Sequence, residues 1–377
     1  MPGIYLHIPF CKQACSYCDF HFSTSLNNKT EVISAMMQEL ELRQEELGSS
    51  EITTIYFGGG TPSVLSSDEI KSFITFLRVN FEWANPIEIT LEANAENLTD
   101  ELLTGWAEAG INRLSIGVQS FQQDVLTWMR RTHSALDALN GIPRAKHKGF
   151  DNISIDLIYG LPTHLNMEWE EGIKQAIDLG VQHISSYILT TEPHTLLDKQ
   201  VRSGEVQIPS DEEVKSQYEI LVKQCETAGF DHYEISNFGK PGFYSKHNTS
   251  YWNGVPYVGI GPSAHSYDGK RRSWNIRSNA GYVQSIKKGV LPMESEILSK
   301  ADQFNEYIMT GLRTKKGIDL DIARSRFGQD LKSIYGAFWN EQIQQGLAVE
   351  EGAFWKLSNQ GLLQADSISA HLFLLQE

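Results

Sequence analysis

The apolar and polar positions in the first half of the chain predict strands that alternate with helices. Six runs rich in apolar and β-branched residues have the pattern of strands, at residues 4–8, 52–57, 87–91, 113–118, 153–158 and 181–189. Between them, apolar residues recur at helical spacing, as in Ile70, Phe73, Ile74 and Leu77. Repeated units of this kind form a parallel sheet through right-handed crossovers. Because the repeat stops near residue 190, short of the eight units of a closed barrel, we expect an α/β fold with a partial (β/α)6 barrel.

The second half of the chain follows a different pattern. Ser210 and Glu213 predict a capped helix start, and Cys225 falls in the apolar stripe of that helix, as a packing residue would. Residues 239–262 are rich in Gly and Pro and predict a long irregular loop. From residue 299, short helices, a hairpin over residues 347–357 and a last helix predict a small winged-helix-like domain. We therefore expect a core at 1–238, a loop-rich extension at 239–298 and a C-terminal domain at 299–377.

Composition narrows the classes of function. The 377 residues carry a formal net charge of −15, which disfavours nucleic acid or an anionic membrane surface as the main partner. The sequence has no run of about eighteen apolar residues, which a transmembrane helix would need, and no signal peptide is evident at the N-terminus. The chain has only four cysteines, and they do not have the pattern of a disulfide framework, so we expect a protein of the reducing cytoplasm.

Three of the four cysteines lie within eight residues, at Cys11, Cys15 and Cys18. An iron–sulfur cubane normally takes four thiolates, so three thiolates leave one iron open to a substrate or cofactor. Two alternatives compete with this interpretation. One is a structural zinc site completed by His21 or His7, and the other is a set of unligated core cysteines.

Unusual polar or glycine-rich motifs follow four successive predicted strands. The cysteine segment follows the first strand, Gly58-Gly59-Gly60-Thr61 the second, Glu92 the third and Gln119 the fourth. Glycines let the backbone approach a ligand closely, and no Lys follows to make a nucleotide-binding P-loop. Functional groups in parallel α/β sheets gather at the carboxyl ends of the strands. The position of all four motifs at strand ends favours one shared cofactor site over a structural zinc site.

The cysteine spacing, with Tyr17 before the last Cys, resembles the cluster loop of the radical S-adenosylmethionine (SAM) proteins, in which three cysteines bind a 4Fe-4S cluster and SAM chelates the fourth iron. The segments 5–11, 58–62, 117–121 and 156–162 resemble one group of these proteins, the oxygen-independent coproporphyrinogen III oxidases (HemN) and the related haem chaperones (HemW). The resemblance implies a radical SAM barrel with a small C-terminal domain, and Cys11, Cys15 and Cys18 as cluster ligands. It implies SAM contacts from Tyr5, Tyr17, Gly59, Gly60, Thr61, Glu92, Gln119, Arg131 and Asp156.

Two departures bear on the oxidase activity. The oxidases carry a fourth cysteine two residues after the third, where this chain has Asp19-Phe20, and they carry an extension before the first strand, which starts at once here. Coproporphyrinogen decarboxylation is therefore in doubt.

A second motif points to haem. His247-Asn248-Thr-Ser-Tyr251-Trp252 combines an imidazole, which can ligate haem iron, with flat aromatic side chains. Composition alone favours ordinary packing of these side chains. The motif nevertheless resembles the haem-binding signature of the HemW chaperones, and this resemblance implies His247 as the iron ligand, with less defined roles for Asn248, Tyr251 and Trp252.

The sequence therefore predicts a cytoplasmic haem chaperone that carries a 4Fe-4S cluster and SAM and passes haem to a haem-requiring apoprotein. A membrane-bound respiratory complex is one such acceptor, and a homodimer is one oligomeric option. The alternative is a radical SAM coproporphyrinogen III oxidase. A third interpretation is a zinc-braced α/β protein without redox chemistry.

Overall fold

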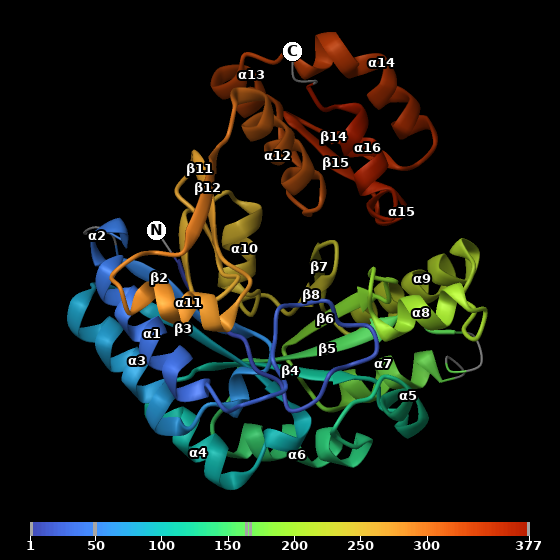
Figure 1. The fold of residues 1–377 in the computed structure, drawn as a ribbon. Coiled ribbons are helices and arrows are strands. Elements are labelled where there is room, and N and C mark those ends of the chain that lie inside the picture. Colours follow the sequence, from blue (N-terminus) through green and yellow to red (C-terminus); the bar gives the residue numbers. More distant parts are fainter. Residues whose placement is uncertain (1–2, 48–50, 163–164, 166–167, 375–377) are drawn as a thin grey trace.

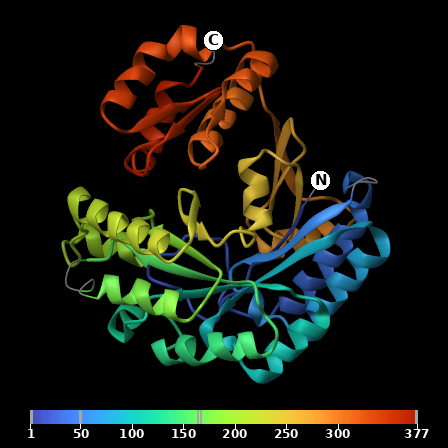
Figure 2. The ribbon, with the colours of Figure 1, turned by 180° about the vertical axis from the view of Figure 1, so that it is seen from behind.

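The computed structural model describes residues 3–47, 51–162, 165 and 168–374. It has a large α/β barrel body and a smaller domain formed by the C-terminal residues, which lies on the side of the barrel where the chain begins (Figures 1 and 2). None of the described helices is long and apolar enough to cross a membrane.

Six parallel strands form the barrel wall, as the sequence predicts. They are β1 (Gly3–Ile8), β2 (Ile52–Gly59), β3 (Trp83–Asn94), β4 (Arg113–Gln119), β5 (Ile153–Tyr159) and β6 (His183–Ile188). In register, Ile4 pairs with Ile55 and Ile55 with Ile89, and all three side chains are fully or almost fully buried. The wall therefore rests on an apolar face shared by successive strands, which is what the β-branched runs indicate.

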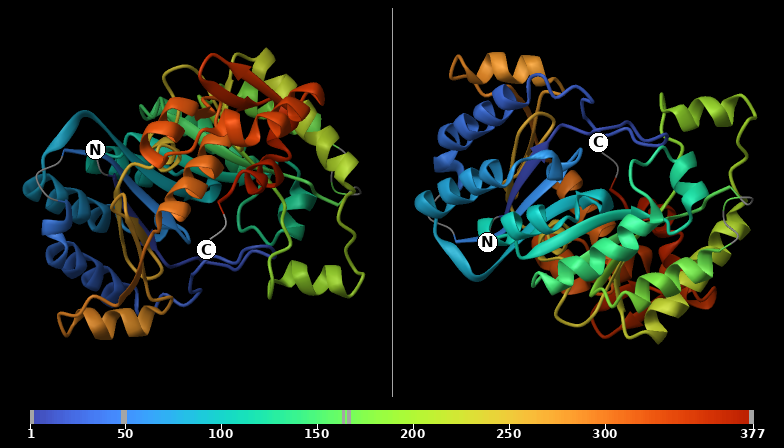
Figure 3. Two further views of the ribbon diagram at one scale, coloured as in Figure 1. Left: turned by 90° about the horizontal axis from the view of Figure 1, so that it is seen from above. Right: turned by 90° about the horizontal axis from the view of Figure 1, so that it is seen from below.

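Helices cover the outer face of the strands (Figure 3). The barrel helices are α1 (Lys29–Leu42), α2 (Gln44–Leu47), α3 (Ser67–Asn80), α4 (Asp100–Ala109), α5 (Gln123–Trp128), α6 (Ala135–His147), α7 (Trp169–Asp178), α8 (Leu196–Arg202) and α9 (Asp211–Thr227). Capping boxes begin α3 at Ser66 and α9 at Ser210, because each serine accepts from the N–H of the glutamate three residues on. Cys225 is fully buried on α9, which confirms it as a packing residue.

The segment after α9 extends the same sheet. Its elements are β7 (Asp231–Glu234), β8 (Asn237–Gly239), α10 (Lys246–Trp252), β9 (Tyr257–Ile260), β10 (His265–Tyr267), β11 (Arg271–Asn275), α11 (Asn279–Ile286) and β12 (Met293–Ile297). Strand β9 pairs in parallel with β1, β10 to β12 continue outward from it, and β8 closes on β6. The expectation of an irregular loop over residues 239–262 is therefore wrong. Its glycines and prolines lie around a short helix and a strand, whose apolar residues are too few to show periodicity.

A buried carboxylate ties this extension to the barrel. Glu39 of α1 is fully buried, and it accepts from Arg43 Nη1 at 3.1 Å, Asn275 Nδ2 at 2.8 Å and the Gly261 N–H at 2.8 Å. The hydroxyl of Tyr282 on α11 also donates to it. One side chain thus satisfies donors from four separate segments, which fixes where the extension lies.

We expect Glu39→Ala to destabilise the protein by about 3–5 kcal/mol, because it removes the buried one of the two carboxylates that pair with Arg43 and leaves several other buried donors without their acceptor. Chemical denaturation followed by circular dichroism measures this loss. Glu46→Ala is the matched control: Glu46 also pairs with Arg43, at 2.7 Å, but is 43% exposed, so its loss should cost no more than about 1 kcal/mol. Equal losses from both variants would contradict the structural role given to Glu39.

The C-terminal domain has a core of its own. It comprises α12 (Lys300–Leu312), β13 (Ile318–Asp319), α13 (Leu320–Phe327), α14 (Leu331–Gln344), β14 (Ala348–Glu351), β15 (Phe354–Leu357), α15 (Asn359–Leu362) and α16 (Ala365–His371). Strands β14 and β15 form the predicted hairpin, which β13 extends to a three-stranded sheet. The rings of Trp339 and Trp355 stack at 4.5 Å between centroids in the centre of this core, which is separate from that of the barrel.

Candidate functional site

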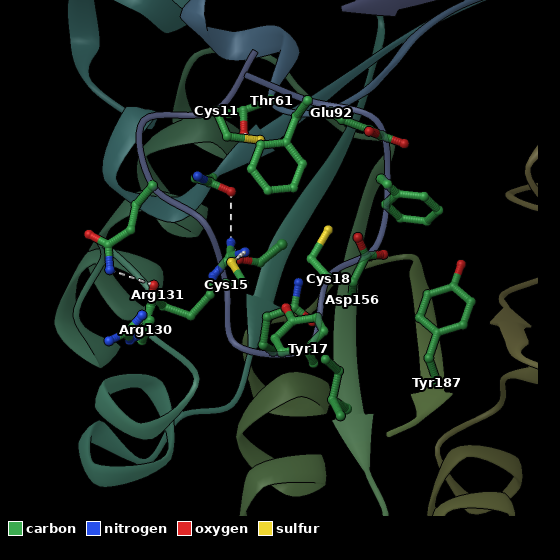
Figure 4. Close-up of a pocket in the computed structure, with 18 of the residues that line it drawn as sticks. Cys11, Cys15, Tyr17, Cys18, Thr61, Glu92, Arg130, Arg131, Asp156 and Tyr187 are labelled. Atoms are coloured by element: carbon green, nitrogen blue, oxygen red, sulfur yellow. Dashed lines mark hydrogen bonds between the residues drawn. The ribbon is translucent and has the colours of Figure 1, made fainter. Parts of the chain in front are cut away.

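A cavity of about 700 Å³ opens at the carboxyl ends of the barrel strands. Nearly all of the residues predicted to hold the cluster and SAM line it together (Figure 4). They are Cys11, Cys15, Tyr17, Cys18, Gly59, Gly60, Thr61, Glu92, Gln119, Arg131 and Asp156. The parallel alignment of β1 to β5 brings these residues, which span almost 150 positions of sequence, to one rim.

The three cysteines are half-buried on one loop beside the cavity. Thr61 Oγ1 donates to Cys11 Sγ at 3.3 Å, and Arg131 Nη1 donates to Cys15 Sγ at 3.4 Å. Burial raises the pKa of the Cys11 and Cys18 thiols to about 11. Without a bound metal these thiols are therefore protonated at neutral pH, and metal binding must release their protons.

The histidines near the cysteines are engaged elsewhere. His7 Nε2 lies 3.0 Å from the His21 carbonyl oxygen, and His7 Nδ1 lies 3.2 Å from the Tyr5 hydroxyl. His21 Nε2 lies 2.8 Å from Asn279 Oδ1. Among the residues that the structure describes, no group of three or more His, Cys, Asp or Glu is arranged around a single metal ion. The zinc alternative, which needs a histidine as fourth ligand, therefore finds no support in this geometry.

The glycine loop at the end of β2 lies against the backbone that leads into the cysteines. The Gly60 N–H donates to the Ile8 carbonyl at 2.9 Å, and the Thr61 N–H donates to the Phe10 carbonyl at 2.7 Å. A Cβ on Gly60 would lie 2.6 Å from the Phe10 carbonyl oxygen. Gly59 has a φ of +108°, and a Cβ there would also meet the His7 ring at 2.8 Å. Only glycine permits this approach at both positions, which explains why the loop is glycine-rich.

Two carboxyl groups face the cavity from β3 and β5, the strands on either side of β4. Burial raises the pKa of Glu92 to about 7, although Tyr56 donates its hydroxyl to Glu92 Oε1 at 2.7 Å. Burial likewise raises the pKa of Asp156 to about 6, against a hydrogen bond of 3.4 Å from Ser115 Oγ. Burial therefore makes both groups costly to ionise. A ligand that brings a cation or hydroxyl donors would stabilise them.

Hydrogen bonds fix the Arg131 side chain on the cavity wall. Its Nη2 donates to Asn94 Oδ1 at 2.7 Å and to the Gly117 carbonyl at 3.1 Å, while its buried Nε has no partner in the described structure. Gln119, next to it on the wall, has a φ of +65°, outside the extended range of its strand. The Arg131 guanidinium lines the cavity, so its positive charge suits an anionic group such as a ligand carboxylate.

The cavity wall differs from the predicted set of residues at a few positions. Tyr5 does not line the cavity; its ring lies against those of Tyr56 and His247, with centroids 6.0 and 6.3 Å away. Asn94 and Ser115 do line it. The strand alternation that turns Glu92 inward would have found Asn94 two residues later.

The haem motif lies on the other side of the barrel, where β1 to β3 begin. It forms helix α10, whose first N–H groups, of Lys246 and His247, donate to the buried carboxylate of Glu88 at 3.1 and 3.0 Å. The His247 ring is buried, with Nδ1 at 2.7 Å from Thr54 Oγ1 and Nε2 at 2.8 Å from the Tyr251 hydroxyl. Burial lowers the pKa of His247 to about 3, so its imidazole is neutral.

The fold, the cysteine loop and the glycine loop together define a radical SAM protein: residues 5–184 match the Radical SAM superfamily, and residues 298–363 match the HemN C-terminal domain. Heme chaperone HemW of Bacillus subtilis is 33% identical over 371 residues, which cover 98% of each chain. Heme chaperone HemW of Lactococcus lactis is 34% identical over 343 residues, 91% of this chain and 89% of that one. The chain belongs to the HemW family of heme chaperones.

A solved structure supports the fold independently. Coproporphyrinogen III oxidase (HemN) from Escherichia coli superposes with a TM-score of 0.83, covering 98% of this chain and 89% of its own at 20% identity. It confirms a radical SAM barrel with a small C-terminal domain.

The residues present fit the cofactors of this superfamily, a 4Fe-4S cluster and SAM. Cys11, Cys15 and Cys18 supply the three thiolates of such a cluster. The carboxyl groups of Glu92 and Asp156 and the guanidinium of Arg131 offer partners for the ammonium, hydroxyl and carboxylate groups of SAM. A bound cluster would supply reducing electrons to a ligand on its open iron.

We expect Cys15→Ala to abolish the cluster, because two thiolates cannot replace three. After anaerobic reconstitution, iron and sulfide analysis and the visible absorption of the cluster measure the loss. Cys225→Ala is the matched control, since Cys225 lies on α9 in the core, away from the cavity. The variant should keep wild-type iron content, and parallel losses in both variants would contradict the assignment.

We expect Glu92→Gln to stabilise the SAM-free protein at high pH. The pKa of Glu92 is about 7 in the fold against an ordinary 4.5, so wild type loses stability as pH rises from about 4.5 to about 7, whereas glutamine has no such loss. The variant should exceed wild type by about 1–3 kcal/mol at pH 8, with the difference shrinking towards pH 5. Denaturation at both pH values measures it, with the exposed Glu101→Gln as control. A difference independent of pH would contradict the assignment.

Proposed function

We propose that the protein is a haem chaperone that binds haem at the motif of α10 and passes it to a haem-requiring apoprotein. Family membership over the full chain supports this function, and so does the complete motif from His247 to Trp252 on a single helix. The neutral imidazole of His247 is the protonation state that ligates haem iron.

The cluster and SAM have a supporting or regulatory role in this proposal. The cofactor cavity and the haem motif lie at opposite ends of one barrel interior. A change in side-chain packing in this interior can therefore affect both sites. We further propose that the chain works in the cytoplasm, that a membrane-bound respiratory complex is among its haem acceptors, and that a homodimer is its transferring form.

The buried His247 ring sets a condition on haem binding. Its two nitrogens are bonded to Thr54 and Tyr251, so an iron atom reaches Nε2 only after the tyrosine hydroxyl has moved away. Haem capture at His247 therefore includes a rearrangement of α10 or of the Tyr251 side chain.

The alternative function is the oxidative decarboxylation of coproporphyrinogen III. The cavity beside the cysteines has a volume of about 700 Å³, within the range of ligand-binding sites. The chain has Asp19 and Phe20 after Cys18, where the oxidases have a fourth cysteine, and this favours the chaperone. An anaerobic assay for protoporphyrinogen formation would detect the oxidase activity.

We expect His247→Ala to weaken haem binding at least tenfold and to remove the histidine-ligated haem spectrum. Titration of haem into protein with an intact cluster, followed in the Soret region, measures both. His265→Ala is the matched control, because His265 is exposed on β10, and it should bind as wild type does. Wild-type affinity in His247→Ala would contradict the role of His247, and a wild type that binds no haem would contradict the proposed function.

A further inference from the structure

A second cavity lies between the barrel extension and the C-terminal domain. It has a volume of about 370 Å³, within the range of small-ligand sites. Helix α10 and strands β9 to β11 form one side, and α12, β13 and α13 of the C-terminal domain form the other. We call it the interdomain cleft; the C-terminal domain lies over α10 at this point (Figure 1).

Aromatic side chains form much of the wall of the interdomain cleft. The rings of Tyr251 and Tyr257 meet edge to face at 4.5 Å, and Tyr267 and Tyr307 line the same space. Trp252 of α10 also lines it, and its buried indole Nε1 has no hydrogen-bond partner in the described structure. Aromatic walls of this kind suit a flat ligand with apolar faces.

The charges of the cleft favour an anion. Arg272, Lys316 and Arg326 line it, against two carboxylates, Glu306 and Asp319. Glu306 is paired with Arg272 at 2.8 Å, and Asp319 caps α13. Lys316 and Arg326 are exposed and form no ion pair among the described residues. Two unpaired cations at one cavity stand out in a chain of net charge −15, and they fit a ligand with two carboxylates.

The cleft is also next to the buried imidazole of the motif. Tyr251 lines the cleft with its ring, and its hydroxyl lies 2.8 Å from His247 Nε2. The imidazole therefore lies directly behind this wall, and a shift of one tyrosine side chain would open it to the cleft.

We propose that the interdomain cleft binds the tetrapyrrole of the haem cargo, with the ring faces against the tyrosines and the two propionates on Lys316 and Arg326. The inference rests on the haem-chaperone function and adds to it the site and the residues that recognise the carboxylates. The iron then faces α10, and His247 becomes its ligand when Tyr251 moves aside. The C-terminal domain is thus half of the cargo site.

Two forms of the ligand test the charge recognition. Full-length protein with an intact cluster is titrated with haem and with haem dimethyl ester, which has the same ring and iron but no propionate charge. We expect Lys316→Gln/Arg326→Gln to weaken haem binding about tenfold and to leave the binding of the dimethyl ester unchanged. Cluster absorption and the melting temperature should equal those of wild type.

The matched control is Lys71→Gln/Lys287→Gln, which removes two exposed positive charges from α3 and the end of α11, away from the cleft. It should bind both ligands as wild type does. Unchanged haem affinity in the cleft variant, equal losses for haem and ester, or the same loss in the control would each overturn the proposed cleft. A wild type that binds neither ligand would instead overturn the haem-chaperone function itself.

Discussion

The parallel register of β1, β2 and β3 is the constraint on which the rest of the structure depends. In this register the Ile8 and Phe10 carbonyls accept from Gly60 and Thr61, which brings the glycine loop against the cysteine loop. A shift by one residue would turn the inward side chains outward and separate Glu92 from the cysteines. The cofactor cavity is therefore a consequence of strand pairing, supported by apolar packing on the outer face.

The barrel interior is polar along its length, and this joins the two candidate sites. At the cavity end, Glu92 accepts from Tyr56, whose ring stacks on that of His247 with centroids 4.9 Å apart. At the other end, His247 contacts Tyr251, which lines the interdomain cleft. These side chains form a continuous line of contacts from the cofactor cavity to the cleft. Burial holds both Glu92 and His247 towards their neutral forms.

Helix α10 shows how one local element is fixed by distant residues. Ser245 caps it, Glu88 of β3 accepts its first N–H groups, and Thr54 of β2 contacts its histidine. A helix of seven residues has little stability alone, because the cost of nucleation is spread over few hydrogen bonds. Its conformation is therefore imposed by the strands beneath it, and the Gly and Pro residues around it hid it from sequence reasoning.

The sequence by itself determined the barrel strands, the cysteine loop and most of the cavity wall. Those features depend on patterns that are local, such as alternation within a strand, or on a rule of parallel sheets that gathers strand ends. Tertiary structure alone decided that Tyr5 leaves the cavity wall, that His247 is buried behind Tyr251, and that the C-terminal domain completes a cleft beside α10. Each of these depends on contacts between residues far apart in the chain, and no local pattern encodes which surfaces meet.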